Sequence, residues 1–401
     1  MKYLFDLVLV FLFLTSCKEE KKPFSTTYSE GDNEIRTFQL NTYTDTIPLK
    51  LTDIAGDFRI VRLETTDSCL VSMFNLQVNE KYIIILSMDK LVLFDSNGKY
   101  LRTLANEGRG PDEYQYLWRL TLNSQGDKLY GIQNDPAKIY YWALPGNSYK
   151  SIPVKQNIDP TDFMVVDDSL FFITNTRSQF WQNKLYVLDS TGKTRYHFPN
   201  RFNEDTKRSH SRKILYHLNG GNYYYPHWSD SIYQISGDTL MLKYAFLSHP
   251  KEEIEIEHMT PNLIMCRSFT PERDEAREMK NPFTGEIQHV TVTHGSHYQY
   301  IINTQTHKVI SYRNLKNDIL SDQLGLELIP SLKVYLCDYI VYFYKPTVLL
   351  KRIPEVLEKN NIDDAIRTRL QDLLENLKED DNPVLLIGKL KNNPDGGAVL
   401  W

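Results

Sequence analysis

The sequence predicts an all-β protein of the propeller class, built from four-stranded antiparallel blades. Three observations predict it: a strand-and-turn pattern that recurs along the chain, a second strand signal before the turns, and a content of 26 tyrosines. Tyrosine favours strands, and a repeat of about 40–50 residues is the length of one blade. The 401 residues could otherwise form two or three domains, so the repeat favours a single one.

The first element is a short apolar segment over residues 4–14, interrupted only by Asp6. A helix that spans a membrane permanently needs about 20 apolar residues, so residues 1–16 are predicted to be a signal peptide. Leu14-Thr15-Ser16-Cys17 resembles the lipobox of bacterial lipoproteins, which implies cleavage before Cys17 and attachment of a diacylglycerol to its sulfur. The alternative is an ordinary buried cysteine beside an ordinary signal peptide.

Residues 17–45 are predicted to be the lipidated cysteine and a flexible tether. The first part of this range is polar and without periodicity, so it buries too little apolar surface to fold alone. Residues 17–20 resemble the export signal of some Gram-negative lipoproteins, while a solvated linker on the periplasmic side is the alternative. We therefore expect an outer-membrane lipoprotein of the cell envelope, periplasmic or surface-exposed, that reaches the membrane through the lipid on Cys17.

The propeller is predicted over residues 46–401, and its repeated unit is an apolar strand that runs into a turn. The unit reads LVLFDSNGK at residues 91–99 and KLYVLDSTGK at residues 184–193. Looser copies lie at residues 138–146 and 231–238. Spacings of 46, 48 and 45 residues separate the equivalent positions, which are Phe94, Tyr140, Leu188 and Tyr233.

A fifth copy, residues 298–304, comes later than the period requires, and we attribute the delay to an inserted charged loop over residues 272–286. A second strand signal, rich in β-branched and aromatic residues and bounded by Asp, Asn or Gly, precedes the first four turns. It occupies residues 82–86, 128–132, 169–173 and 222–225. Each blade is therefore predicted to be a meander, and packing the blades around an axis leaves only short sheet edges.

One segment has the pattern of a helix. From Pro354 to Lys378, apolar residues recur at steps of three and four amid charges, with a proline at the start. Residues 360–364 interrupt the pattern, so two helices are the alternative. The strand signal at residues 382–390 is predicted to complete the last blade. The helix is thus predicted to be an insertion, about residues 353–380, in a sixth blade that it covers with its apolar stripe; a partner-docking role is the alternative.

Four short motifs resemble one protein family: Arg62-Leu63-Glu64-Thr65-Thr66, Gly108 to Tyr114 with its Gly-Arg-Gly-Pro turn, Ser229 to Tyr233, and Asp381 to Val384. They look like the six-bladed β-propeller lipoproteins of Bacteroidota-type gut bacteria, whose propellers are similar in outline to NHL repeats. The resemblance covers nearly the whole mature chain. It implies a six-bladed fold and carries no established reaction or ligand. NHL-type propellers bind partners more often than they catalyse.

Composition narrows the classes of function. The net charge of −5 and the lack of a dense basic cluster argue against a nucleic-acid partner. Once Cys17 is lipidated, Cys69, Cys266 and Cys337 remain, an odd and sparse set that is no disulfide framework. We expect no catalytic cysteine, no cofactor and a monomer.

Histidines gather in the fourth and fifth blades, but not in a metal-binding pattern, because no cysteine is near and no His-Glu-x-x-His helix is present. They are His210, His217, His227, His289, His294 and His297. We therefore predict no metal site. Gly108 to Tyr114 is predicted to be a turn between blades one and two rather than a phosphate loop, with Glu113 as an acid that anchors the turn.

Ligand binding is expected at the central channel, where propeller enzymes often place His, Arg and Asp from several blades. Loop placement selects the first positions to test, which are Arg109, Arg177, His210 and His227. Aromatic side chains, with Trp228 first among them, are candidates for a platform that stacks on a sugar or peptide, while packing between blades is the competing interpretation. The others are Trp181, Tyr223, Tyr224 and Tyr225.

The predicted function is that of a non-catalytic binding or docking module for an extracytoplasmic ligand or protein partner, with a protein or a glycan as ligand. A hydrolase or lyase that acts on a glycan or peptide at the channel is the alternative, and a scaffold for an envelope complex is a third interpretation. Convergence of polar side chains at one mouth of the channel would favour the enzyme, and their dispersal on the outer rim would count against it.

Overall fold

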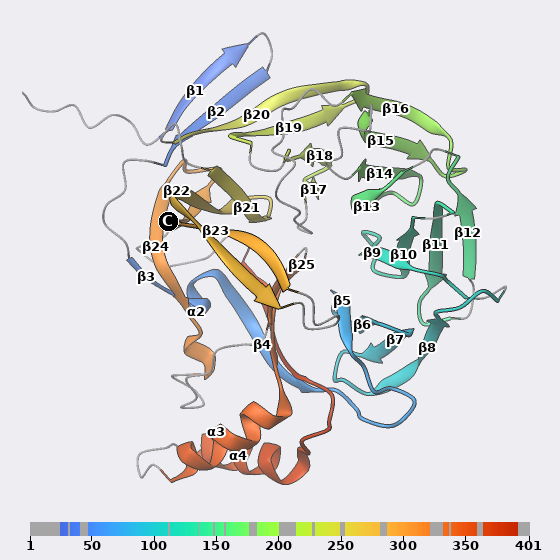
Figure 1. The fold of residues 1–401 in the computed structure, drawn as a ribbon, viewed down its shortest axis with the longest axis vertical. Coiled ribbons are helices and arrows are strands. Elements are labelled where there is room, and N and C mark those ends of the chain that lie inside the picture. The colour runs from blue at the N-terminus through green and yellow to red at the C-terminus, as the bar shows by residue number, and fades with distance from the viewer. Residues whose placement is uncertain are drawn as a thin grey trace, which may run out of the picture.

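The computed structural model describes residues 25–391 with gaps, and these residues form six sheets arranged as a ring around a central axis (Figure 1). The gaps are residues 31–32, 41–46, 111–112, 135, 147–148, 156–157, 176–182, 200–213, 227–228, 249–252, 281–286, 321–331, 337 and 359–363. The predicted all-β propeller with six blades is confirmed. None of the helices in the described residues is long and apolar enough to cross a membrane.

Blades 1, 2 and 3 each consist of four consecutive antiparallel strands that follow one another from the channel outwards. Blade 1 contains β5 (Met73–Val78), β6 (Tyr82–Ser87), β7 (Lys90–Asp95) and β8 (Tyr100–Asn106). Blade 2 contains β9 (Leu117–Leu122), β10 (Lys128–Gln133), β11 (Lys138–Ala143) and β12 (Tyr149–Pro153). Blade 3 contains β13 (Pro160–Val166), β14 (Leu170–Asn175), β15 (Asn183–Asp189) and β16 (Thr194–Pro199). Each is the predicted meander.

Blades 4 and 5 gain parallel strands from the N-terminal part of the chain at their outer edges. Blade 4 contains β17 (Leu215–Leu218), β18 (Gly221–Tyr224), β19 (Ser231–Ser236) and β20 (Thr239–Leu247), extended by β2 (Asn33–Gln39) and β1 (Ser25–Glu30). Blade 5 contains β21 (Glu253–Met259), β22 (Leu263–Lys280), β23 (Ile287–Asn303) and β24 (Val309–Lys316), extended by β3 (Ile47–Lys50). One helical turn, α2 (Leu51–Ile54), then leads into β4 (Ala55–Arg62).

The range predicted to be a flexible tether, residues 17–45, contains ordered structure. Phe38 and Leu40 are fully buried against blade 4, and the backbone N–H of Leu40 donates to the oxygen of Leu247 at 2.9 Å. Because these two apolar side chains find apolar surface at the edge of the blade, the chain folds there although the polar residues before it cannot bury surface of their own. Cys17 lies outside the described residues.

Blade 6 is completed by the N-terminal side of the chain. It contains β25 (Leu332–Leu336), β26 (Tyr339–Tyr344), β27 (Val384–Leu390) and, as its outermost strand, β4. The β27–β4 pairing runs from Val384↔Arg62 to Leu390↔Ala55, and Figure 1 shows the blue β4 beside the orange-red strands of the blade. The strand predicted at residues 382–390 is thus the third strand of its blade, and the ring is closed by two segments from opposite ends of the sequence.

The repeat that predicted the fold is the third strand of each blade and the turn that follows it. The four aligned positions lie in β7, β11, β15 and β19, and the fifth copy is the end of β23. In blades 1 and 3 the turn carries a glycine at positive φ, Gly98 (φ +87°) and Gly192 (φ +79°). A Cβ on either glycine would lie 2.3 Å from a backbone oxygen of the preceding blade's outer strand, that of Arg62 or Pro153.

The interpretation of residues 272–286 as a charged loop is wrong for their first part. Residues 272–280 belong to β22, which pairs with β23 in one hairpin from Leu263↔Asn303 to Lys280↔Ile287. Among the described strands, residues 270–280 and 287–296 pair only with each other, and we call them the arm. The two strands satisfy each other's backbone groups, which explains how a charged sequence without apolar alternation adopts extended structure.

The helical insertion lies between β26 and β27, inside blade 6 as predicted, but the helix begins before Pro354. Helix α3 spans Pro346–Leu357 with Pro346 in its first turn and Pro354 inside it, and α4 spans Asp364–Asn376. The start was missed because β26 is followed by α3 after a single residue, so that the apolar residues of both elements read as one run. The buried side of the two helices packs between blades 5 and 6 through Leu349, Ile353 and Leu370.

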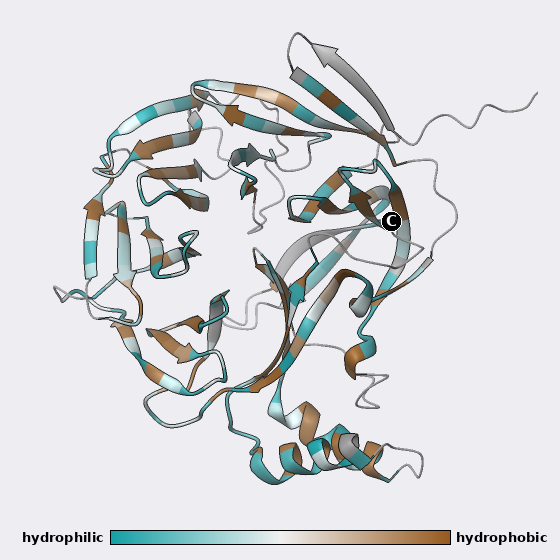
Figure 2. Ribbon diagram, turned by 180° about the vertical axis from the view of Figure 1, so that it is seen from behind, coloured by the Kyte–Doolittle hydropathy of each residue, from teal (hydrophilic) through white to brown (hydrophobic). Residues whose placement is uncertain are grey.

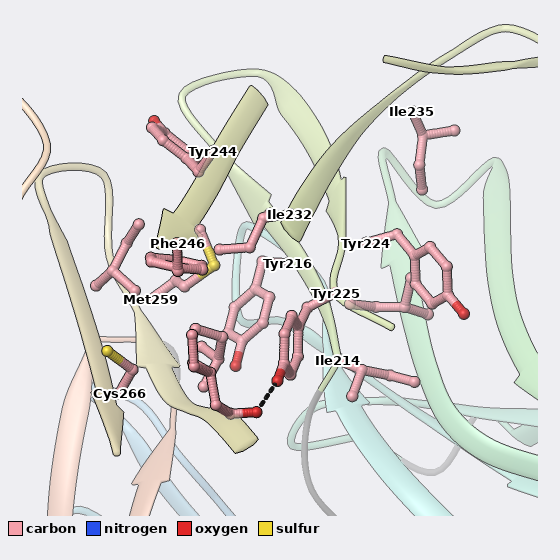
Figure 3. Packing of buried hydrophobic residues seen from close by; sticks show 14 of the residues in the cluster. Ile214, Tyr216, Tyr224, Tyr225, Ile232, Ile235, Tyr244, Phe246, Met259 and Cys266 are labelled. Atoms are coloured by element: carbon pink, nitrogen blue, oxygen red, sulfur yellow. Dashed lines mark hydrogen bonds between the residues drawn. The ribbon is translucent and has the colours of Figure 1, made fainter. Parts of the chain in front are cut away.

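The core lies between neighbouring blades, and Figure 2 shows apolar segments in all of them. Successive side chains of a strand point to opposite faces of its sheet, so an inner strand packs against both neighbours. In β13, Met164 packs in the cluster shared with blade 4 and Val165 in the cluster shared with blade 2. Between blades 4 and 5, the hydroxyl of Tyr225 donates to the backbone oxygen of Ile254 at 2.5 Å (Figure 3).

Candidate functional site

A pocket of about 480 Å³ opens at one mouth of the central channel. It is lined by the last residues of the innermost strands and by the turns that follow them, and every blade contributes: Asn79, Asn123, Val165, His217, Met259 and Asp338 are one residue from each. The volume falls in the range of about 300–1,000 Å³ that is usual for small-molecule sites. The pocket is therefore the candidate site of this protein.

The pocket has an apolar floor and a polar rim. Phe163, Met164 and Met259 line it and are almost fully buried, whereas Gln125 and Asp338 line it and are exposed. Methionine side chains adapt to irregular shapes, and a few polar groups around an apolar surface fix the orientation of a ligand. This arrangement suits a ligand that carries both apolar surface and hydrogen-bonding groups.

Two asparagines at equivalent positions shape the rim of the pocket. The Oδ1 of Asn79 accepts from the backbone N–H of Tyr82 at 2.8 Å, and the Oδ1 of Asn123 accepts from the backbone N–H of Lys128 at 3.0 Å. Asn79 also donates from Nδ2 to the backbone oxygen of Gly126 at 2.9 Å, which connects blade 1 to blade 2. The side chains of both asparagines therefore hold the turns of the rim in place before any ligand binds.

Ion pairs connect other blades at the same mouth. Asp168 of blade 3 accepts from Lys128 at 2.5 Å and from the hydroxyl of Tyr130 at 2.9 Å, both in blade 2. Burial acts to raise the pKa of Asp168, but the hydrogen bonds from these two partners outweigh it and the pKa is lowered. Lys389 of blade 6 lies 2.8 Å from Glu80 of blade 1.

A buried carboxylate holds the inner strands of blades 3 and 4 together. Asp162, 4% exposed, accepts from the backbone N–H groups of Ile214 at 2.7 Å and Leu215 at 2.9 Å. Burial lowers the pKa of the neighbouring Arg119 in β9, and the carboxylate of Asp162 raises it in part. Sequence reasoning missed both residues, although an aspartate inside the apolar strand around residues 160–166 is a signal that could have identified one of them.

His258 is a second residue that the sequence did not single out. It is 1% exposed, its ring stacks on Tyr335 of blade 6 at 5.4 Å between centroids, and it meets Tyr216 of blade 4 edge-on at 6.2 Å. The inner strands of blades 4, 5 and 6 thus meet through three aromatic rings. Offset and edge-on geometries of this kind are the favourable ones for ring pairs.

Of the residues predicted to bind a ligand, only Arg109 lies in the described residues. Arg109 is exposed in the loop that precedes β9, whereas the pocket is lined by the end of β9 and the turn after it. Arg109 is therefore at the opposite end of this strand and does not line the pocket. The other predicted positions, Arg177, His210, His227 and Trp228, fall outside the described residues.

The aromatic residues proposed as a platform pack between blades where they are described. Tyr224 and Tyr225 are fully buried in the cluster shared by blades 3, 4 and 5, and Tyr223 packs against that cluster. Trp181 lies outside the described residues. Neither of the two buried tyrosines presents a ring face to solvent, so packing explains them.

Two of the motifs that carried the family resemblance meet in space. Asn382 donates from Nδ2 to the backbone oxygens of Glu64 at 2.8 Å and Cys69 at 2.9 Å, and its Oδ1 accepts from the N–H of Val71 at 2.9 Å. The backbone N–H of Asn382 donates to the hydroxyl of Thr65 at 2.9 Å. The motifs at residues 62–66 and 381–384 therefore form one buried junction between blade 6 and blade 1.

Gly108 to Gly110 and Glu113 form a turn, as predicted, while Pro111 and Asp112 lie outside the described residues. The carboxylate of Glu113 accepts from the N–H of Gly110 at 2.7 Å, and the N–H of Gly108 donates to the oxygen of Tyr114 at 2.8 Å. Tyr114 is 2% exposed, and burial raises the pKa of its hydroxyl above the ordinary value. The motif thus anchors the entry into blade 2.

Cys69 and Cys266 are buried free thiols, and Cys337 is not among the described residues. In the part of the chain that the structure describes, no group of three or more His, Cys, Asp or Glu side chains is placed to bind a metal.

Two solved structures are similar to this chain, and the first of them supports the fold. A protein of Bacteroides fragilis NCTC 9343 that is proposed to be exported is similar in structure, with a TM-score of 0.61 and 15% identity over 89% of this chain and 99% of that chain. A member of the DUF4221 family from Bacteroides vulgatus ATCC 8482 aligns with a TM-score of 0.49 and 11% identity over 85% of this chain and 98% of that chain.

No curated protein matches the sequence. The sequence pattern of a domain of unknown function, DUF4934, matches residues 35–389. This range begins in β2, before the first blade, and ends in β27, so it includes both strands that close the ring. The chain belongs to the DUF4934 family.

Proposed function

We propose that this protein is a binding module of the cell envelope that recognises a small ligand, a glycan or a peptide, in the pocket at the mouth of its channel. The observation that carries the proposal is the pocket itself, since six blades supply one apolar floor and a rim of polar side chains. The asparagine caps and the Asp168 contacts of the rim favour binding, because a preorganised site loses less entropy when a ligand binds.

The test is binding of soluble oligosaccharides and peptides to the mature chain, followed by titration calorimetry. The double variant Gln125→Ala/Asp338→Ala changes two exposed rim residues, and we expect its affinity for the ligand found to be at least about tenfold weaker, or about 1.4 kcal/mol. Arg109→Ala, at the other end of β9, is the matched control and should bind as the unchanged chain does. Equal affinities in all three proteins would refute the pocket as the site.

Attachment to the outer membrane through Cys17 is part of the same proposal. The residues Leu14-Thr15-Ser16-Cys17 support it, as does the export proposed for the B. fragilis relative. Metabolic labelling with an alkyne fatty acid should mark the protein, and Cys17→Ala should remove the label and release the protein from the membrane. Protease treatment of intact cells then distinguishes a surface-exposed propeller from a periplasmic one.

The second candidate is a hydrolase or lyase that acts on a glycan or peptide in the same pocket. It is favoured by His217, an exposed pocket residue whose Nδ1 lies 2.8 Å from Oδ1 of Asn222, because an oriented imidazole can transfer protons. Release of product from a bound ligand, lost in His217→Ala while binding is retained, would establish catalysis. Binding of the ligand without release of product would contradict the enzyme and support the binding module.

A further inference from the structure

We propose that one part of the propeller's rim, the outer edge of blades 4 and 5 around β1 and β2, lies against the membrane surface, with anionic lipid head groups as its partner. We call this part the anchor rim. The inference rests on the acylation of Cys17 proposed above and adds an orientation to it. Four observations carry it: the length of the free tether, the place where the tether joins the fold, the firmness of that junction, and the side chains around it.

The tether is short once the ordered strands are taken into account. Strand β1 begins at Ser25, so residues 18–24 alone separate the fold from Cys17. A fully extended chain spans at most about 3.3–3.6 Å per residue, which places Ser25 within roughly 30 Å of the lipidated sulfur. A compact chain of 401 residues has a radius of gyration of about 21 Å. The reach of the tether is therefore less than the width of the propeller.

The tether joins the molecule at its edge and not at a mouth of the channel. In the sheet of blade 4, β1 is the outermost strand, followed by β2 and then by β20, and Figure 1 shows this pair outside the ring beside blade 5. The register places Ser25 opposite Phe38 of β2. The lipid therefore holds the rim of blades 4 and 5 near the bilayer, while the pocket, which is lined by the innermost strands, stays away from the attachment.

Strand β2 is held firmly enough in the fold for the position of the lipid to determine which rim of the propeller lies near the bilayer. Phe38 and Leu40 of the β2 segment are fully buried, and the ring of Phe38 contacts those of Tyr244 and Phe246 in β20 with centroids 6.1 Å apart in each pair. The guanidinium of Arg36 donates to the backbone oxygen of Thr304, so that the same strand is also connected to blade 5. A pull on the tether thus acts on the body of the propeller and not on a loose end.

The side chains of the anchor rim suit an anionic lipid surface. Arg36 forms an ion pair with Glu34 at 3.0 Å that lowers the pKa of this carboxyl, and Lys243 lies close enough to lower it further. His307 also acts on it, and Lys308 follows His307 in the sequence. Lysine side chains are attracted to anionic leaflets when they lie near the surface, whereas burial lowers the pKa of His307 below its ordinary value of 6.5, so its imidazole is uncharged at neutral pH. At the end of β20, Leu247 pairs with Gln39 of β2 and is 49% exposed, so an apolar side chain is available on this rim to contact the interface of a bilayer.

Photo-crosslinking to lipid tests the orientation. The acylated full-length protein is placed in vesicles of phosphatidylethanolamine and anionic phosphatidylglycerol, with p-benzoylphenylalanine at Leu247 or, in a separate variant, at Leu101. Leu101 is the matched control, because it is a comparably exposed leucine, 41%, on the outer strand of blade 1, which lies across the ring from blade 4. We expect at least fivefold more lipid adduct from position 247 than from position 101.

Two further variants sharpen the result. Insertion of twenty Gly/Ser residues after Lys22 should reduce the adduct ratio toward one, since a flexible linker grows in reach with the square root of its length. Lys243→Glu/Lys308→Glu should lower the adduct at position 247 at least twofold. An equal yield at both positions in the acylated chain with its natural tether overturns the orientation. A chain that incorporates no alkyne fatty acid overturns the anchor itself, so the two failures are distinguishable.

Discussion

At the scale of single residues, the blades are joined by side chains and glycines whose partners lie in a neighbouring blade. Asn382 connects blade 6 to blade 1, Asp162 connects blade 3 to blade 4, and Gly98 lets a turn approach the backbone at Arg62. Such contacts supplement the apolar packing, because a buried polar group that loses its partner costs about 1–3 kcal/mol. Two substitutions measure how much they contribute.

Gly98→Ala is expected to lower the free energy of unfolding by about 2–5 kcal/mol. A positive φ costs an L-residue roughly 1–2 kcal/mol, and a Cβ placed 2.3 Å from the backbone oxygen of Arg62 adds about 1–3 kcal/mol of overpacking. Gly220→Ala is the control, since Gly220 also has a positive φ (+74°) but nothing lies within 4 Å of its Cβ position. Urea denaturation of both variants gives the difference, and equal losses would contradict the steric explanation.

Asp168→Asn is expected to remove stability at neutral pH and to change its pH dependence. The pKa of Asp168 in the folded chain lies below the ordinary value of 3.8, so its contribution is fully present above that value and is lost as the pH falls through the folded pKa. Because the side chain is 27% exposed, we expect about 1 kcal/mol. Unfolding at pH 7 and pH 3 measures it, with Asp238→Asn as control. A loss that stays constant between these pH values would contradict the assignment.

At the scale of elements, chain segments behave differently according to what they pack against. The strands of each blade are buried between two neighbours, and helices α3 and α4 cover blades 5 and 6. The arm is the exception, since its two strands pair with each other alone among the described strands. A two-stranded ribbon has little stability of its own, so we expect the arm and the propeller to be energetically independent.

Shortening the arm should therefore leave the propeller intact. Replacing residues 272–294 by Asn-Gly, between Pro271 and Gly295, which face each other in the hairpin, is expected to change the free energy of unfolding by less than about 1 kcal/mol, since among the described strands it removes no pairing with another strand of the propeller. Phe269→Ala tests that the assay is sensitive, because Phe269 is 7% exposed in the same strand and such a change costs about 3–5 kcal/mol. A loss of cooperative unfolding on shortening would show that the arm contributes to the fold.

At the scale of the whole molecule, stability depends on closing the ring. Blade 6 takes its outer strand from residues 55–62, and β2 and β3 extend the two blades before it. The N-terminal segment thus runs along the outer edges of blades 4, 5 and 6 in turn. It covers edges that would otherwise be open to pairing with other chains.

Two truncations test this closure. A chain that begins at Asn33 keeps β2, β3 and β4, and we expect it to unfold cooperatively at nearly the melting temperature of the mature chain. A chain that begins at Leu63 lacks the buried Phe38, Leu40, Leu51 and Val61, each worth about 1.5–3 kcal/mol. Their sum reaches the whole stability of an ordinary domain, about 5–15 kcal/mol. Circular dichroism during heating should show no cooperative transition, and a folded truncated chain would refute the closure.

Local elements of the fold were predicted from the sequence, whereas pairings between distant segments were not. The strands around Phe94 and Leu188 and the turns after them were predicted, because period-two burial and turn chemistry are local properties of the sequence. The pairing of β4 with β27 was not predicted, because the local pattern of residues 55–62 does not indicate which distant strand they pair with. The arm was missed because its residues lack apolar alternation. Ligand binding at the channel was predicted, but the residues that line the candidate site were not, because they come from strand ends and turns of six separate blades.

The sequence by itself determined the class of fold, five copies of the strand-and-turn unit and the place of the helical insertion, since each follows from local periodicity and from a repeated turn. The count of six blades came from the resemblance of four short motifs to a known family. Only the tertiary structure decided which residues meet at the channel and where the N-terminal segment joins the rim. Asn79 and His217 line one pocket, and Asn382 meets Glu64, although long stretches of chain separate them. The physical reason is that a site of this kind is made by the closing of a ring, and closure is a property of the whole chain.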